Sequence, residues 1–276
     1  MANFNSDGFK DGSIALAPAT YPLVHGDETI VRMRQANGHK KTAIITGASR
    51  GIGASLVRKF RDRGYRVVAN SRNISSTHSF DSLSDIFLVD GDIGKQDTAK
   101  KVAAAAMTYF GSIDVLVNNA GIFLTKPFTD YTEDDFMALV STNLAGFFFL
   151  SQLAITQMMK QRSGSIVNIS TSLVDQPIAC LPAALPILTK GALHAVTRGL
   201  ATECVAHGIR VNAVSAGMID TPLNPTEIHD FLRTLEPMGR LGEIDEIVHA
   251  VVYLTEAAFV TGEVLRVDGG QHAGRW

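Results

Sequence analysis

The segment TGASRGIG, Thr46–Gly53, decides the fold of this chain. It begins at the end of the apolar run TAIIT and leads into ASLVRKFRDRG, whose apolar residues recur at helical spacing. Glycines at positions 47, 51 and 53 allow a tight turn and let a diphosphate approach the backbone, where the first N–H groups of a helix are free. The segment therefore predicts a nucleotide-binding turn between a strand and a helix.

The same alternation of short apolar runs and helical stretches continues to the end of the chain. Further strands are expected at residues 65–70, 86–90, 113–121, 164–170, 208–217 and 262–270, with helices between them. Buried strands that alternate with helices form parallel sheets covered on both faces. We expect one α/β domain over residues 40–276, a doubly wound Rossmann-type fold with a seven-stranded parallel sheet, preceded by an N-terminal extension over residues 1–39.

Composition narrows the class of protein. Of the 276 residues, 46% are hydrophobic and 19% are charged, and the net charge is −2, which favours neither nucleic acid nor an anionic membrane as partner. No uninterrupted apolar run reaches the ~18 residues of a membrane span, and the N-terminus does not resemble a signal peptide. Cys180 and Cys204 are expected to be free thiols in a reducing cytoplasm, with no metal site.

The residues after the second expected strand indicate which dinucleotide binds. An acidic residue there would bind the ribose hydroxyls of NAD(H). The chain instead has ANSRN, with Ser71 and Arg72, and a second arginine, Arg50, lies inside the glycine turn. Because guanidinium groups bind phosphate through paired hydrogen bonds, the pattern favours NADP(H) over NAD(H).

Taken in order, these motifs resemble those of the short-chain dehydrogenase/reductase family, over about 235 residues from Lys41. Besides the glycine turn, the matching segments are GDI at Asp92, NNAG at Asn118–Gly121, STNLAG at Asn143, VNISTS, Lys190, and AVSAGMIDT, which has Ala216 in place of a proline. The resemblance implies hydride transfer between a nicotinamide cofactor and a carbonyl or alcohol. The implied cofactor-binding residues are Gly47, Ser49, Arg50, Gly51, Ile52, Gly53, Ser71, Arg72, Asp92, Ile93, Asn119, Ala120, Gly121, Lys190, Gly217, Ile219 and Thr221.

The resemblance also implies catalytic residues, and here the chain departs from the family. Asn143, Ser172 and Lys190 match the family's catalytic asparagine, serine and lysine, with Thr171 and Ser170 as alternatives to Ser172. The tyrosine expected four residues before the lysine is replaced by Pro186, which suits the first turn of a helix. We expect Asn143, Ser172 and Lys190 to converge on one cleft.

Three hypotheses follow from the missing tyrosine. The proton donor of an oxidoreductase could be Lys190, Asp175, a water held by Asn143, or Tyr21 from the extension. Alternatively, the substrate could carry its own acidic group. In the third hypothesis, the chain binds NADP(H) but turns over little, as a sensor or as a partner in an oligomer.

Apolar residues suggest the substrate and the assembly. Met218, Leu223, Phe231 and Leu232 follow the sixth strand, where the family has a mobile flap, and favour a small, partly apolar substrate. The helices that start near Glu133 and Pro186 are apolar on all sides and require cover. A homodimer or homotetramer is therefore expected.

Overall fold

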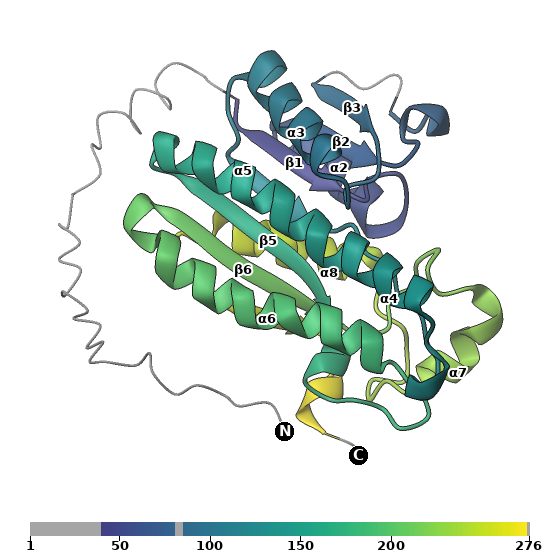
Figure 1. The fold of residues 1–276 in the computed structure, drawn as a ribbon. Helices are drawn as coiled ribbons and strands as arrows, with labels where there is room; N and C mark the ends of the chain where they lie inside the picture. The colour runs from purple at the N-terminus through teal and green to yellow at the C-terminus, as the bar shows by residue number, and fades with distance from the viewer. Residues whose placement is uncertain (1–39, 81–84, 275–276) are drawn as a thin grey trace, which may run out of the picture.

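The computed structural model describes residues 40–80 and 85–274, so the expected extension over residues 1–39 lies outside the described residues. Seven parallel strands form one sheet in the order β3-β2-β1-β4-β5-β6-β7, which confirms the predicted fold class (Figure 1). The strands are β1 (Thr42–Thr46), β2 (Arg66–Ser71), β3 (Ile86–Asp90), β4 (Val115–Asn118), β5 (Gly164–Thr171), β6 (Ile209–Ala216) and β7 (Val264–Val267). Strand order reverses between β1 and β4, where sheets of this kind bind ligands.

Helices cover both faces of the sheet. One face packs against α2 (Gly51–Asp62) and α8 (Ile244–Glu256), and the other against α3 (Gln96–Ala105), α5 (Gly146–Gln161) and α6 (Ala184–Cys204). Strand β1 contributes to both layers, because Ala43 and Ile45 face the first and Ile44 the second. The burial of all five residues of β1 therefore follows from its central place in the sheet.

The long apolar helix expected from Glu133 is one continuous helical run with a local change of winding. Helix α4 (Glu133–Leu139) passes through a π-helical turn, Val140–Ala145, into α5. By length and composition, Glu133–Gln161 is the one described helix that could cross a membrane. A core helix of a globular protein can have the same length and composition. Helix α5 packs against α3 and the sheet, which identifies it as a core helix.

Helix α6 forms as the sequence predicts, despite its proline. Pro186 is the third residue of the helix, and the first turn needs no N–H donor from it. One helix was not predicted: α7 (His229–Arg233), a short helix in the segment between β6 and α8. The fourth and seventh strands are also shorter than expected, because their glycine and asparagine ends turn away at the carboxyl edge of the sheet.

Candidate active site

The glycine turn lies at the carboxyl end of β1, over the start of α2. Gly47 has a φ of 65°, and a Cβ atom there would lie 2.8 Å from the Cα atom of Ala120. Gly53 is equally closed to a side chain, since its Cβ would collide with the carbonyl oxygen of Gly47. The first turn of α2 has no side-chain cap and no acidic residue. These free N–H donors and the positive end of the helix dipole fit an anionic diphosphate.

Hydrogen bonds fasten this turn to the end of β4. The Thr46 hydroxyl accepts from the backbone N–H groups of Asn119 and Ala120, at 3.1 and 3.0 Å. The Asn119 amide donates in return to the carbonyl oxygens of Thr46 and Gly47. The Asn119 side chain thus shapes the cradle, and its amide protons are used within the protein.

The end of β2 meets the glycine turn. The Ser71 hydroxyl donates to that of Ser49 at 3.0 Å. Next to this pair, Arg50 and Arg72 are exposed, and neither side chain has a hydrogen bond or ion pair with a described residue. The two serines and the two arginines leave hydroxyl and guanidinium donors available at one corner of the cradle.

Asp92 and Ile93 follow β3 and have different surroundings. Asp92 is partly buried, and its carboxylate accepts from the N–H of Gly94 at 2.9 Å. Ile93 is 5% exposed and packs on Gly146, where an added Cβ would lie 2.8 Å from its methyl group. Any contact from Ile93 to a cofactor would therefore use its backbone.

The segment after β6 faces the glycine turn. A Cβ atom on Gly51 would lie 3.7 Å from Cβ of Thr221 and 3.5 Å from Pro222. Ile219 is buried and pairs with Gly242 in an isolated parallel bridge, which anchors the segment. Thr221 and the turn thus form two sides of one cleft.

Lys190 and Asn143 meet at Gly121. A Cβ atom on this glycine would lie 2.8 Å from Nζ of Lys190 and 3.4 Å from Oδ1 of Asn143. The Nζ atom donates to the carbonyl oxygen of Ile169 on β5, at 2.8 Å. Burial lowers the pKa of Lys190 from 10.5 to about 8. The ammonium group can therefore lose a proton near neutral pH.

Asn143 lies in the π-helical turn, and its side chain is almost saturated. Oδ1 accepts from the N–H of Ile122, and Nδ2 donates to the carbonyl of Ile122 and to the Thr189 hydroxyl. The side chain is 2% exposed. It joins the loop after β4 to α6, directly beside Lys190, and its Oδ1 atom keeps one further lone pair.

Ser172 does not join this pair, which corrects the expectation that three side chains converge. Its hydroxyl is fully buried and donates to Oε1 of Gln271 at 2.6 Å. Ser170 is also committed, since its hydroxyl donates to the carbonyl of Lys190 at 3.1 Å. Thr171 lies between them, is partly buried, and its hydroxyl only accepts, from Leu173 N–H at 3.4 Å. Thr171 is the hydroxyl of the three with a proton to donate.

Pro186 lies one helical turn before Lys190 and is buried. A second tyrosine near this end of α6 was not predicted. Tyr131, just before α4, donates from its hydroxyl to the carbonyl of Leu124 at 2.7 Å, and backbone groups of Lys126 and Leu185 lie beside it. Burial raises its pKa. The phenol is held in place by these contacts.

Asp175, one of the suggested proton donors, forms an ion pair with Arg266 at 3.2 Å. Tyr21 lies outside the described residues. Within residues 40–80 and 85–274, no group of three or more His, Cys, Asp or Glu side chains could hold a metal ion. Lys190 is thus the titratable side chain that the fold brings to Gly121.

The segment from Met218 to Leu232 has a buried and an exposed side. Met218 and Leu232 are 8% and 3% exposed and pack with Leu173 in a small cluster, whereas Leu223 and Phe231 are 53% and 45% exposed. The Asn224 amide donates to the carbonyl of Ile219 at 2.8 Å. Two of the four predicted substrate-contacting residues are therefore packing residues.

Comparison with known proteins identifies the family. Residues 47–272 match the family model described as enoyl-(acyl carrier protein) reductase. The chain is 36% identical over 243 residues to gluconate 5-dehydrogenase of Gluconobacter oxydans, covering 83% of this chain and 93% of that protein. The chain belongs to the short-chain dehydrogenase/reductase family of oxidoreductases, as its motifs suggested.

Solved structures share the fold. The structure of ElxO with NADP bound has a TM-score of 0.80 and 31% identity, covering 85% of this chain and all of that one. A 3-ketoacyl-(acyl-carrier-protein) reductase from Brucella melitensis, in complex with NADH, also has a TM-score of 0.80, at 29% identity, covering 84% of this chain and 98% of that one. Sheets of this kind bind ligands beyond the carboxyl ends of their strands, which is the edge where the glycine turn, Gly121 and Thr221 lie.

Proposed function

We propose that this protein is an NADP(H)-dependent oxidoreductase that interconverts a carbonyl and an alcohol on a small, partly apolar substrate. The observation that carries the proposal is the meeting of Lys190 and Asn143 at Gly121, beside a cradle that only glycine can form. A bound nicotinamide dinucleotide supplies or accepts the hydride. The residues of the chain bind and orient this cofactor and donate or accept the proton.

In this proposal, the residues of the glycine turn and its neighbours each bind a different part of the cofactor. The N–H groups at the start of α2 would hold the diphosphate, and Asn119 keeps the turn in shape. Asp92 and the backbone of Ile93 line the adenine end in this proposal. Ala120, Gly121, Gly217, Ile219 and Thr221 border the nicotinamide end.

The choice of NADP(H) rests on the corner formed by Ser49, Arg50, Ser71 and Arg72. Two exposed guanidinium groups with no partner in the described part of the chain fit a 2′-phosphate, and no acidic residue ends β2 to bind a free ribose hydroxyl. ElxO, which has the same fold, is described with NADP bound. The NADH complex of the Brucella reductase is the reason that both cofactors belong in the test.

Lys190 is the proton donor in this proposal. With a pKa of about 8, its ammonium group is present at neutral pH and can protonate an alkoxide as a carbonyl is reduced. Thr171 would hold the substrate oxygen, because the hydroxyls of Ser172 and Ser170 already donate within the protein. Asn143 holds the loop after β4 against Thr189 and so fixes the place of Lys190.

The proposed substrate class rests on the apolar residues between β6 and α8 and on the relatives of this chain. Leu223 and Phe231 offer exposed apolar surface near Thr221 in the sequence. The relatives named above are a gluconate dehydrogenase and a ketoacyl reductase, so polyhydroxy acids and acyl ketones form the first panel of substrates. A substrate with its own acidic group would not need Lys190 as donor.

We also propose a homodimer or homotetramer built on the long helices. Phe136, Met137, Phe148 and Leu188 on α4, α5 and α6 are between 44% and 58% exposed in the single chain. Covering such side chains is favourable by roughly 25 cal/mol per Å² of apolar surface. Light scattering after size-exclusion chromatography gives the state directly, and a monomer at micromolar concentration contradicts this part. The cytoplasmic location stays a prediction.

The test measures binding and turnover separately. NADPH and NADH binding is followed by fluorescence titration, and NADPH oxidation is followed with the carbonyl panel, with Lys190→Ala as control. We expect NADPH to bind more tightly than NADH, and turnover to be lost in the variant. Tight binding with no turnover on any substrate would instead favour an NADP(H)-binding sensor, and no binding of either dinucleotide would refute the proposal.

A further inference from the structure

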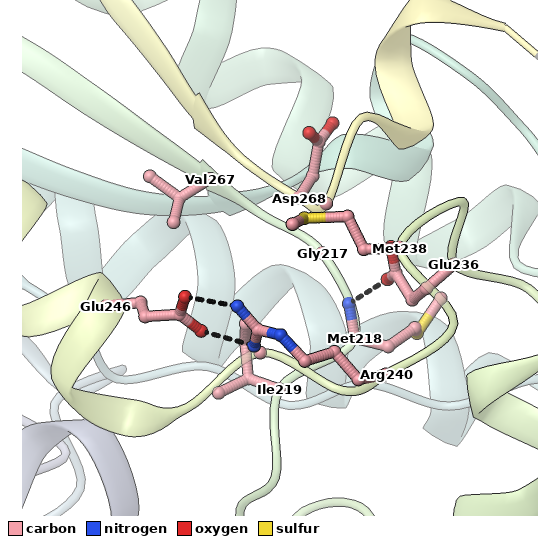
Figure 2. Close-up of a pocket in the computed structure, with 11 residues that line it drawn as sticks. Gly217, Met218, Ile219, Glu236, Met238, Arg240, Glu246, Val267 and Asp268 are labelled. Carbon is pink, nitrogen blue, oxygen red and sulfur yellow. Dashed lines mark hydrogen bonds and ion pairs between the residues drawn. The ribbon is translucent and has the colours of Figure 1, made fainter.

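A small cavity lies behind the segment that follows β6, at the carboxyl ends of β6 and β7 (Figure 2). Its volume is about 40 Å³, room for one water molecule or little more. Gly217, Met218 and Ile219 form one wall, and Glu236, Met238 and Asp268 form others. The cavity therefore borders Gly217 and Ile219, assigned above to the cofactor, and is also lined by Glu236, which no step proposed above uses.

Glu236 is one of the charged side chains that line this cavity. It is 5% exposed, and its Oε1 atom accepts a hydrogen bond from the N–H of Met218 at 2.6 Å (Figure 2). Its Oε2 atom is fully buried and has no hydrogen-bond partner among the residues that the structure describes. A buried carboxyl oxygen without a partner is costly, so this arrangement needs an explanation.

Glycines on both sides make room for the carboxyl group. A Cβ atom on Gly217 would lie 2.9 Å from Oε1, and one on Gly269 would lie 3.1 Å from Oε2. Gly217 directly precedes Met218, whose N–H binds Glu236. The backbone thus closes on the carboxyl group from β6 and from β7.

The charged groups around the cavity do not neutralise Glu236. Asp268 is 5% exposed, and its carboxylate accepts from the N–H groups of Gly270 and His272 and pairs with the His272 ring. Arg240 lines the cavity but binds Glu246 through two hydrogen bonds, at 2.9 and 2.7 Å. Burial raises the pKa of Glu236 to about 7; the Met218 N–H opposes the rise and Asp268 adds to it.

We propose that Glu236 is a positioning residue, whose neutral carboxyl group holds Gly217–Thr221 in place for the nicotinamide end of the cofactor and whose ionisation releases that segment. The inference rests on the proposed function, because Gly217, Ile219 and Thr221 are residues assigned there to the cofactor. In the neutral form, the carboxyl group carries no charge, so the buried Oε2 atom can stay out of contact with water at a lower cost. In the ionised form, a second buried carboxylate lies near Asp268, and the segment must move to let water reach it.

The experiment compares wild type with Glu236→Gln and Glu236→Leu. Glutamine keeps an oxygen that accepts from Met218 and cannot ionise, whereas leucine keeps much of the volume and loses the hydrogen bond. NADPH affinity is titrated between pH 6 and 8.5. We expect the wild-type affinity relative to that of the glutamine variant to fall about tenfold over this range, the factor that one unit of pKa shift on binding gives.

Dividing the wild-type affinity by that of the glutamine variant cancels the effect of other titrating groups, since Lys190 and the cofactor phosphates are the same in both proteins. Leucine is expected to weaken binding at both ends of the range. Equal pH profiles for wild type and the glutamine variant, or unchanged binding by the leucine variant, would overturn the inference.

A second measurement separates this inference from the proposed function. Hydrogen exchange of the 217–221 backbone is measured without cofactor and expressed as protection factors. We expect protection to fall with rising pH in wild type and to stay constant in Glu236→Gln. If neither wild type nor either variant binds NADPH, the proposed function fails. The protection factors then still show whether Glu236 holds the segment.

Discussion

The Nζ atom of Lys190 lies 2.8 Å from the carbonyl oxygen of Ile169 and donates a hydrogen bond to it. This contact pins the lysine of α6 to the end of β5, with Gly121 on its other side. Only one of its three donor positions is used by a described partner, so two remain for a cofactor or a substrate.

Replacing Lys190 tests its role as proton donor. We expect Lys190→Ala to lower kcat for carbonyl reduction by about 10² or more, the usual contribution of a general acid. Lys190→Arg keeps the positive charge, so it should bind NADPH as wild type does. Its guanidinium group holds its protons too tightly to donate one, so kcat should stay as low as in Lys190→Ala. Steady-state kinetics with fluorescence titration gives both values, and recovery of kcat by arginine would assign Lys190 to binding alone.

The pH dependence of the rate gives an independent check. Because the donor is the ammonium form, kcat at saturating NADPH should be constant below the pKa of about 8 and fall as pH rises above it. Oxidation of the alcohol should show the opposite trend, since it needs the neutral amine. A reduction rate that increases through pH 8 is incompatible with a lysine donor.

Arg72 should set the cofactor preference. Charged hydrogen bonds contribute about 1.5–3 kcal/mol, so Arg72→Ala should reduce the preference for NADPH over NADH by roughly 10- to 100-fold. Ser71→Asp, which places a carboxylate at the end of β2, should reverse the preference by repelling the 2′-phosphate. Arg198→Ala, at an exposed arginine on α6, serves as control. Equal NADPH-to-NADH ratios of kcat/KM in Arg72→Ala and wild type would remove the arginine argument.

Gly121 offers a test of geometry with little cost to the fold. In Gly121→Ala, the new methyl group would lie 2.8 Å from Nζ and 3.3 Å from Cε of Lys190, so the flexible end of the lysine must move. We expect the free energy of unfolding to change by less than about 1 kcal/mol. We expect kcat to fall by ~10² or more, because the proton donor Nζ of Lys190 would be displaced.

The matched control is Gly199→Ala. Gly199 lies in α6 with no atom within 4 Å of an added Cβ, so alanine should stabilise the helix by about 0.5–1 kcal/mol and leave kcat unchanged. Urea denaturation and kinetics on the same samples compare the two variants. Full activity in Gly121→Ala would mean that the position of Lys190 is not critical.

Glu236 should leave a signature in stability. Its pKa is about 7 in the folded protein and near its ordinary 4.5 when unfolded, so the folded state binds more protons between these values. The contribution of Glu236 to the free energy of unfolding should therefore fall as pH rises from ~4.5 to ~7, by up to about 3 kcal/mol at 1.4 kcal/mol per unit. Urea denaturation at several pH values should show this fall as a difference between wild type and Glu236→Gln, in which other titrating groups such as His194 cancel; identical slopes in the two proteins contradict a raised pKa.

Local patterns in the sequence predicted the fold and the cradle. The TAIIT run and the glycines after it depend on neighbouring residues alone, and β1 and α2 form as expected. The place of Ser172 could not be predicted in this way, because its partner, Gln271, is 99 residues further along the chain. Glu236 was missed for the same reason, since only tertiary packing buries it against Met218.

The bond between Ser172 and Gln271 also has a consequence for biosynthesis. Gln271 follows β7, the edge strand, and its amide reaches both the Ser172 hydroxyl and the carbonyl of Gln176. Because Gln271 lies 99 residues beyond Ser172, the turn after β5 cannot satisfy its polar groups until the segment after β7 has been synthesised and has packed beside it. A chain truncated before Gln271 would leave the Ser172 hydroxyl and the carbonyl of Gln176 without their hydrogen-bond partner at the end of β5.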